Sequence, residues 1–169
     1  PEASRAPEII VLNTPAFLDT MMPHQSHQPT KIEDNSETCW YFAYGSNLSP
    51  PVFTGKRGIK PLDFKVSFLP GYALCFNILF MPYSEPAMAG LKICGKDDEP
   101  VYGVQYLLSR ADFLKLVASE GAGVAYRVVS AEANCLDDGT NVTVFTLIAR
   151  RALFTSQQRL PSQRYMLVD

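Results

Sequence analysis

One helix signal is interposed among a series of strand signals in the part of the chain with the composition of a folded core. Aromatic and β-branched residues recur in the stretches 40–44, 65–69, 72–80, 101–108, 124–135 and 142–149, as is typical of strands. The helix signal begins at Ser109, a capping residue followed three positions later by Asp112. Because helices do not alternate with the strands, the pattern argues against a doubly wound parallel sheet. It predicts an α+β fold with a curled, mixed or mostly antiparallel sheet and a few helices.

The helix predicted after Ser109 has a defined apolar face and a defined end. The residues expected to face the core are Phe113, Leu114, Val117 and Ala118. Glu120 stands at the expected last turn, and Gly121 is a common type of residue just past a helix end. Further along, Asp137-Asp138-Gly139-Thr140 predicts a hairpin turn.

The chain divides by composition into two parts. Residues 1–38 are polar and rich in Pro, so we expect an extension that forms no domain of its own. Residues 39–169 are expected to form one domain. A further helix signal at Ser162 stands close to the last residue, Asp169, so we expect the native protein to continue beyond it.

The composition of the chain limits the kinds of partner and the cell compartment that we expect for it. The formal net charge of -2 provides no basic surface for nucleic acid. The most apolar run, residues 73–81, is too short to span a bilayer, so no membrane is expected as a partner. The four cysteines form no C-x-x-C pair and are predicted to be free thiols in a reducing compartment, the cytoplasm.

The stretch from Tyr41 to Leu48, YFAYGSNL, joins four strand-forming residues to a polar bend. If Gly45 had positive φ, the N–H groups of Gly45, Ser46 and Asn47 could converge on a small anion such as a carboxylate. The stretch lacks the additional glycines of a dinucleotide-binding loop and the Gly-Lys-Ser/Thr of a phosphate loop. An anion-binding loop and a plain turn both fit these residues.

Glu120 is the candidate carboxylate for acid–base chemistry. At a helix C-terminus it faces the negative end of the helix dipole, which disfavours its charge and suits a general base. A solvated side chain at a frayed helix end is the alternative, and Glu85 is the second candidate. The only histidines, His24 and His27, lie in the polar extension, which argues against a Ser-His or Cys-His nucleophile and against a metal site.

Taken in order along the chain, these features resemble the gamma-glutamyl cyclotransferase family. The resemblance covers roughly residues 40–169 and rests on YFAYGSNL, a Val-Tyr-Gly-Val strand from Val101, Glu120-Gly121, Tyr126, and Pro161-Ser162-Gln163-Arg164-Tyr165. The spacing from Glu120 to Tyr126 differs slightly from that of mammalian members. The resemblance implies a small barrel-like mixed sheet with flanking helices, no metal and no cofactor.

The resemblance also implies a reaction and a set of site residues. Glu120 would be the catalytic carboxylate, with substrate-binding residues Tyr41, Phe42, Ala43, Tyr44, Gly45, Ser46, Asn47, Tyr126 and Tyr165. The reaction would be attack of the α-amine of a gamma-glutamyl compound on its own γ-carbonyl, releasing 5-oxoproline and an amine.

The substrate, the expected small-molecule partner, would be a dipeptide, glutathione or a glutathione adduct; no oligomeric state is predicted. An inactive binding module of the same fold and a gamma-glutamyl amide hydrolase remain the alternatives.

Overall fold

The computed structural model of the chain describes residues 37–78, 88–95, 99–120 and 126–149. The strands in these ranges are β1 (Thr38–Ala43), β2 (Asp63–Leu69), β3 (Tyr72–Ile78), β4 (Met88–Ile93), β5 (Val101–Ser109), β6 (Tyr126–Cys135) and β7 (Asn141–Ala149). The helices are the 3-10 helix η1 (Ser46–Leu48), the π-helix η2 (Pro51–Lys56) and the α-helix α1 (Arg110–Ser119).

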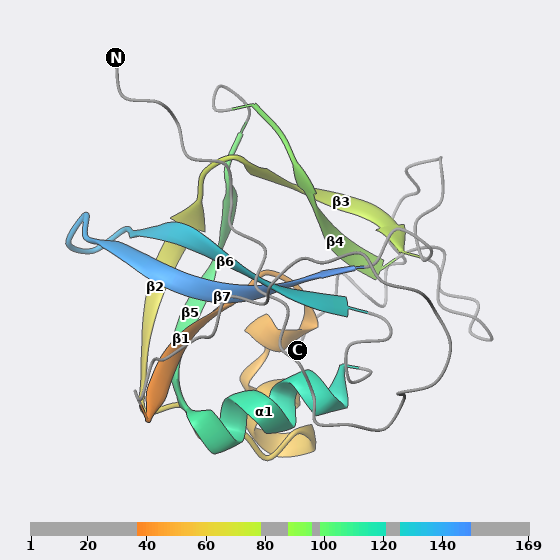
Figure 1. Cartoon of the computed structure of the whole chain (residues 1–169), viewed down its shortest axis with the longest axis vertical. Helices are drawn as coiled ribbons and strands as arrows, with labels where there is room; N and C mark the ends of the chain where they lie inside the picture. Colours follow the sequence, from red (N-terminus) through yellow and green to blue (C-terminus); the bar gives the residue numbers. More distant parts are fainter. Residues whose placement is uncertain (1–36, 79–87, 96–98, 121–125, 150–169) are drawn as a thin grey trace, which may run out of the picture.

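Five strands close into a barrel in the order β1-β5-β2-β6-β7 (Figure 1). Neighbouring strands are antiparallel except at the closure, where β1 runs parallel to β7 with Tyr41 opposite Phe145. Strands β3 and β4 form a separate two-stranded sheet. The prediction of a small mixed barrel-like sheet is therefore confirmed.

Side chains alternate along the barrel strands and supply two hydrophobic clusters. The first, here called the barrel interior, also receives Tyr72 and Leu91 from β3 and β4, and its other buried members are Phe42, Leu69, Val101, Val129, Ala133, Val144 and Ile148. The second, here called the outer layer, packs barrel residues against η2, α1 and Ile59, and its members are Tyr41, Ala43, Phe53, Ile59, Tyr106, Leu108, Phe113, Leu116, Val128 and Leu147. Tyr41 and Phe42, neighbours on β1, thus belong to different clusters.

The barrel is packed tightly where β1 meets β5. A Cβ atom on Gly103 would collide with the carbonyl oxygen of Ala43 and would lie 2.7 Å from the ring of Phe42. Only a residue without a side chain leaves room for the fully buried Phe42 ring at this point.

Helix α1 begins as predicted, with the Ser109 hydroxyl accepting a hydrogen bond from the Asp112 amide at 3.1 Å. The predicted apolar face is wrong in part, because Leu114 is 52 % exposed and Ala118 is exposed. Phe113 is buried as predicted, and Leu116, which the prediction left out, is the other buried residue of the helix. This face continues at the spacing i, i+3, i+7 to position 120, so Glu120 lies at the end of the stripe that faces the barrel.

Other predicted elements agree with the structure to within a few residues, and the turn before Thr140 is confirmed, since the Thr140 amide and hydroxyl both donate to Asp138 Oδ1. Strand β4 is missing from the prediction because its sequence, MAGLKI, contains two weak strand formers, Ala and Gly. The helix signal at Ser162 lies outside the described residues. In the part of the chain that is described, no helix combines the length and apolar character needed to cross a bilayer.

Candidate active site

The YGSN stretch forms the start of η1 directly after β1. Gly45 has φ of -132°, so it does not have the positive φ that the anion-binding hypothesis assumed. Its carbonyl oxygen accepts a hydrogen bond from the Leu48 amide at 2.8 Å. No acceptor among the described residues faces the amides of Ser46 and Asn47, which come first in this short helix and so have no partner within it.

Asn47 links the loop to the end of α1. Its side chain is only 6 % exposed, and its Nδ2 atom donates to the hydroxyl of Tyr41 at 2.9 Å and to Glu120 Oε1 at 3.1 Å. A carboxylate oxygen only accepts hydrogen bonds when ionised, so this contact fixes which end of the amide is the nitrogen. The other end, Oδ1, is buried, and no residue in the described ranges forms a hydrogen bond with it.

The hydroxyl of Tyr41, which accepts the hydrogen bond from Asn47, is neutral. Burial raises the pKa of Tyr41 far above its ordinary value, the hydrogen bond from Asn47 opposes the shift, and the nearby charge of Glu120 adds to it. Its ring is nearly parallel to that of Phe53, with centroids 6.1 Å apart. The hydroxyl therefore stays protonated at any working pH and serves as a fixed partner for Asn47.

Glu120 caps the C-terminus of α1 and pairs with a cation from another element. Its amide donates to the Leu116 and Val117 carbonyls, and its Oε1 atom lies 2.5 Å from Arg57 Nη2. Arg57 Nη1 also donates to the hydroxyl of Ser119. The last turn of α1 contains no basic residue of its own, so Arg57 supplies the positive charge that a helix C-terminus favours.

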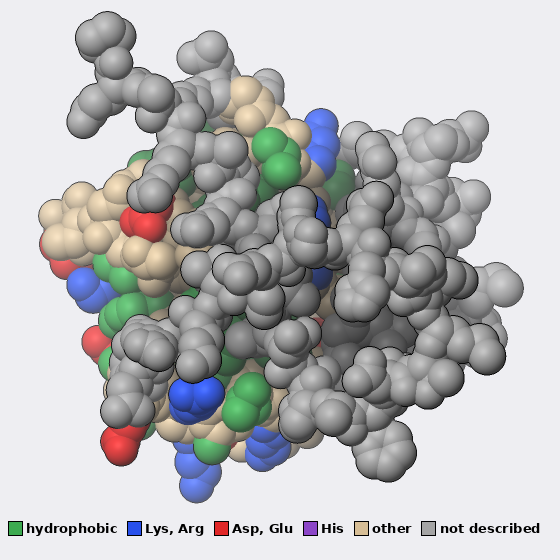
Figure 2. All heavy atoms as spheres, in the orientation of Figure 1, with side chains coloured by type: hydrophobic (Ala, Val, Ile, Leu, Met, Phe, Trp, Pro, Cys, Tyr) green, Lys and Arg blue, Asp and Glu red, His purple; other side chains and the backbone are tan. Residues whose placement is uncertain are grey.

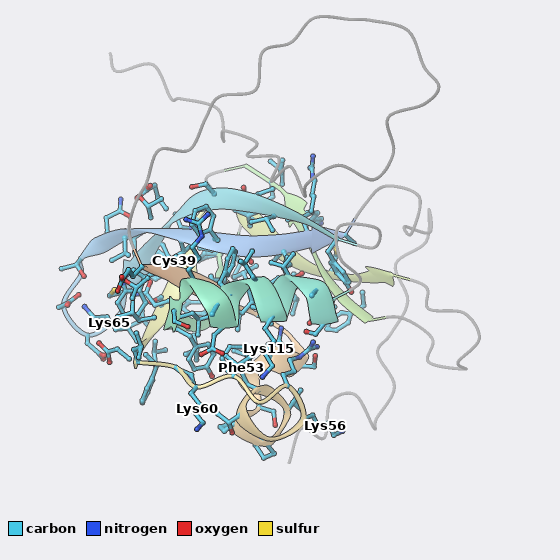
Figure 3. The ribbon with its side chains drawn as sticks, turned by 60° about the horizontal axis from the view of Figure 1, so that its bottom comes forward. Cys39, Phe53, Lys56, Lys60, Lys65 and Lys115 are labelled. Atoms are coloured by element: carbon cyan, nitrogen blue, oxygen red, sulfur yellow. The ribbon has the colours of Figure 1, made fainter. Side chains whose placement is uncertain are left out.

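The segment that ends in Arg57 is anchored on the barrel by aromatic packing. Phe53 of η2 stacks on Tyr106 with ring centroids 4.5 Å apart, and Gly58, which follows Arg57, has φ of +60°. The Gly58 carbonyl accepts a hydrogen bond from Lys115 Nζ on α1 at 2.9 Å. Figure 3 shows Phe53 and Lys115 where η2 approaches α1. In Figure 2, Lys and Arg side chains gather at the bottom of the view, where Figure 1 places α1.

The structure brings three of the predicted site residues, Tyr41, Asn47 and Glu120, into one network. Tyr126 is half-buried against the outer layer, and its phenol lies near enough to Tyr41 to contribute slightly to the raised pKa of that residue. Other residues of the predicted set lie outside this network. Phe42 faces the barrel interior, and Ala43 packs in the outer layer. The Tyr44 hydroxyl donates to the Leu147 carbonyl at 2.6 Å, and Ser46 is exposed.

Tyr165, Glu85, His24 and His27 lie outside the described residues. Among the residues that are described, no group of His, Cys, Asp and Glu side chains is arranged to hold a metal ion.

Arg57 is the residue that the sequence analysis did not identify. Its signals were local and weak: Ser49-Pro50-Pro51 is a typical helix start, and Lys56-Arg57-Gly58 combines basic residues with a glycine as helix ends do. These signals indicate the short helix. They do not indicate that its end meets Glu120, a residue 63 positions later in the chain.

Comparison with curated proteins places this chain in a family. The gamma-glutamyl cyclotransferase verK of Clonostachys rogersoniana is 34% identical over 146 residues, which are 76% of this chain and 81% of that protein. The chain belongs to the gamma-glutamyl cyclotransferase family. The gamma-glutamyl cyclotransferases gliK of Claviceps purpurea (41% identical over 123 residues, 70% of this chain) and of Aspergillus fumigatus (40% over 154 residues, 80% of this chain) are further members. The matches span 55% and 56% of those two proteins, so the chain spans about half their length.

Solved structures agree with the family's fold. A gamma-glutamyl cyclotransferase structure superposes with a TM-score of 0.66 at 20% identity, covering 78% of this chain and 76% of that one. A yeast gamma-glutamyl cyclotransferase described as specific to glutathione gives a TM-score of 0.55 at 14% identity, over 72% and 74% of the two chains. At these identities the likeness concerns the fold. No family model matches the sequence.

Proposed function

We propose that the protein is a gamma-glutamyl cyclotransferase that closes the glutamyl group of its substrate into 5-oxoproline. The observation that carries the proposal is the partly buried network around Glu120, whose Oε1 atom accepts from Asn47 at 3.1 Å and pairs with Arg57 at 2.5 Å. A carboxylate held by fixed donors at the edge of a packed layer is suited to proton transfer. Membership of a family whose named members carry this activity supports the same reaction.

The chemistry requires one base and a folded substrate. Glu120 would take a proton from the α-ammonium group, and the resulting amine would attack the γ-carbonyl carbon of the same molecule. A C–N bond forms, the original amide C–N bond breaks, and the proton held by Glu120 passes to the leaving nitrogen. The attacking nitrogen then loses its second proton to give the ring N–H of 5-oxoproline, and the released amine takes up a proton to become an ammonium ion. Because the attack is intramolecular, holding the substrate in the reactive shape supplies much of the acceleration, with effective molarities of order 10⁵ M or more.

Substrate binding is proposed for the loop around η1. The amides of Gly45, Ser46 and Asn47 would hold the substrate carboxylate or the oxyanion that develops on the γ-carbonyl, with Tyr126 and Tyr165 beside the glutamyl group. The substrate would be a gamma-glutamyl dipeptide, glutathione or a glutathione adduct. The four free thiols support a reducing compartment, and the cytoplasm is our proposal for it.

Replacing Glu120 by Gln tests the assignment. The variant keeps the shape of the side chain and removes the base, so we expect kcat to fall by about 10² or more while the fold is retained. Glu132→Gln is the matched control, because Glu132 is exposed on β6 and contacts only Thr143 among the described residues. Formation of 5-oxoproline, measured by mass against a panel of gamma-glutamyl compounds, is the readout.

The products separate the three candidate functions. A cyclotransferase releases 5-oxoproline, a hydrolase releases glutamate, and a binding module releases neither. If Glu120→Gln retained more than about a tenth of the parent kcat, the base would have to be another carboxylate, and Glu85 would be tested next.

A further inference from the structure

We propose that Arg57 is a positioning residue, which holds Oε1 of Glu120 so that Oε2 is the oxygen that exchanges protons with the substrate. The inference rests on the proposed function, and it assigns different tasks to the two oxygens of one carboxylate. Arg57 would act through Glu120 and would not touch the reacting atoms.

The first observation is that the donors converge on one oxygen. Asn47 Nδ2 at 3.1 Å and Arg57 Nη2 at 2.5 Å both contact Oε1. No described residue donates a hydrogen bond to Oε2. An ionised carboxylate has lone pairs on both oxygens. The contacts therefore occupy one oxygen and leave the lone pairs of the other available for a proton.

The second observation is that Arg57 is held before any substrate arrives. Its amide donates to the Val52 carbonyl at 3.1 Å, and its second guanidinium nitrogen, Nη1, donates to Ser119, the residue next to Glu120. Ser119 in turn donates to the Leu116 carbonyl at 2.7 Å, within α1. One planar guanidinium group therefore contacts two consecutive residues at the end of α1, which fixes their relative orientation.

The third observation separates a positioning role from plain stabilisation. The side chains of Arg57 and Glu120 are each only 17 % exposed, and the buried Arg57 Nε has no hydrogen-bond partner among the described residues. Burying a charged pair and leaving one of its donors unpaired costs free energy, so such a pair is a poor device for stability alone. Beyond the positive charge that Arg57 places at the C-terminus of α1, the benefit of the pair is the geometric definition of the carboxylate.

The torsional freedom of the Glu120 side chain explains why fixing its carboxylate would affect catalysis. A glutamate at a helix end has three side-chain torsions and would sample several rotamers if it were free. Two donors on one oxygen restrict these torsions and turn the second oxygen toward a single direction. General bases act only within hydrogen-bond reach of the proton they take, so a misdirected Oε2 lowers kcat even when substrate still binds.

Kinetics of the variants Arg57→Gln, Arg57→Lys and Ser119→Ala test the inference. We expect Arg57→Gln to lower kcat by about tenfold or more with KM within about threefold of the parent value. Arg57→Lys should recover part of the loss, because the ammonium group keeps the charge but cannot contact Ser119 and Glu120 together. Ser119→Ala should lower kcat by about threefold. Lys56→Gln, at the exposed neighbouring cation, is the control and should match the parent.

A structural measurement makes the test independent of turnover. In crystal structures of the parent and of Arg57→Gln, we expect the Glu120 carboxylate to leave the position beside Asn47 in the variant. An unmoved carboxylate would overturn the inference whether or not the protein makes 5-oxoproline. Equal kcat for Arg57→Gln and the parent would also overturn it. Absence of 5-oxoproline from the parent would instead count against the proposed function alone.

Discussion

The barrel interior and the outer layer both bury polar side chains, and the comparison shows how differently such groups are used. In the barrel interior, Gln105 Nε2 donates to Cys135 Sγ at 3.0 Å, while Gln105 Oε1 and the Ser67 hydroxyl have no partner in the part of the chain that the structure describes. In the outer layer, donors from Asn47 and Arg57 converge on a carboxylate. Unpartnered buried atoms occur in both regions. Within these two regions, convergence of donors on a carboxylate occurs around Glu120, at the edge of the outer layer, and that feature marks the candidate site.

The difference predicts that interior substitutions change stability and that outer-layer polar substitutions change turnover. Besides the Glu120 and Arg57 variants above, three substitutions test this division, and they are taken from the largest expected effect to the smallest.

Gly103→Ala should give the largest change in stability. Its Cβ atom would collide with the Ala43 carbonyl oxygen and lie 2.7 Å from the Phe42 ring, so β1 and β5 would have to separate. We expect a loss of about 3 kcal/mol in the free energy of unfolding, measured by urea denaturation. Gly55→Ala is the control, since nothing lies within 4 Å of its Cβ position. Equal unfolding midpoints for the two variants would show that the interior is not tightly packed there.

Tyr41→Phe should affect turnover more than stability. The ring and its packing on Phe53 are kept, but Asn47 loses the hydroxyl that orients it. We expect kcat/KM to fall about tenfold, equivalent to about 1.4 kcal/mol, with stability changed by about 1 kcal/mol or less. Tyr106→Phe is the matched control, because Tyr106 stacks on the same Phe53 ring and its hydroxyl forms a hydrogen bond with no described residue. If both variants lost the same activity, the Asn47 contact would have no special role.

Gln105→Met should have the smallest effect. Met has a similar length, and it removes a carbonyl oxygen that is buried without a partner, at the cost of a weak hydrogen bond to sulfur. We expect unfolding free energy to stay within about 1 kcal/mol of the parent value, with turnover unchanged. A loss of activity without a loss of stability would contradict the division between the two regions.

Local signals in the sequence predicted most of the fold. The capping pair Ser109 and Asp112, the hairpin turn before Thr140 and the apolar strands depend on neighbours in the chain, so they could be identified one by one. The phase of α1 could not, because Leu114 and Leu116 are equally apolar, and only packing against the barrel decides which is buried. Strand β4 was missed for a related reason, since its pairing with β3 outweighs its weak propensity.

In the candidate site, too, the features that depend on neighbours in the sequence could be predicted, and those that depend on distant contacts could not. The YGSN bend and Glu120 could be selected from residue type and from position next to a strand or helix end. Arg57 could not, because its role depends on η2 folding back against α1 through Phe53 and the Lys115 contact to Gly58. Nor could the negative φ of Gly45, since glycine populates positive and negative φ about equally well.

The parallel pairing of β1 with β7 sets when, during synthesis, this site can first exist. Tyr41 emerges from the ribosome among the earliest described residues, but its strand closes the barrel on Phe145, and Thr146 bonds the Phe42 carbonyl across 104 positions of the chain. A nascent chain that has not yet reached Phe145 cannot make this closure, and such distant contacts are slow to form. The layer that carries Tyr41 is therefore completed only after nearly all the strands have been translated.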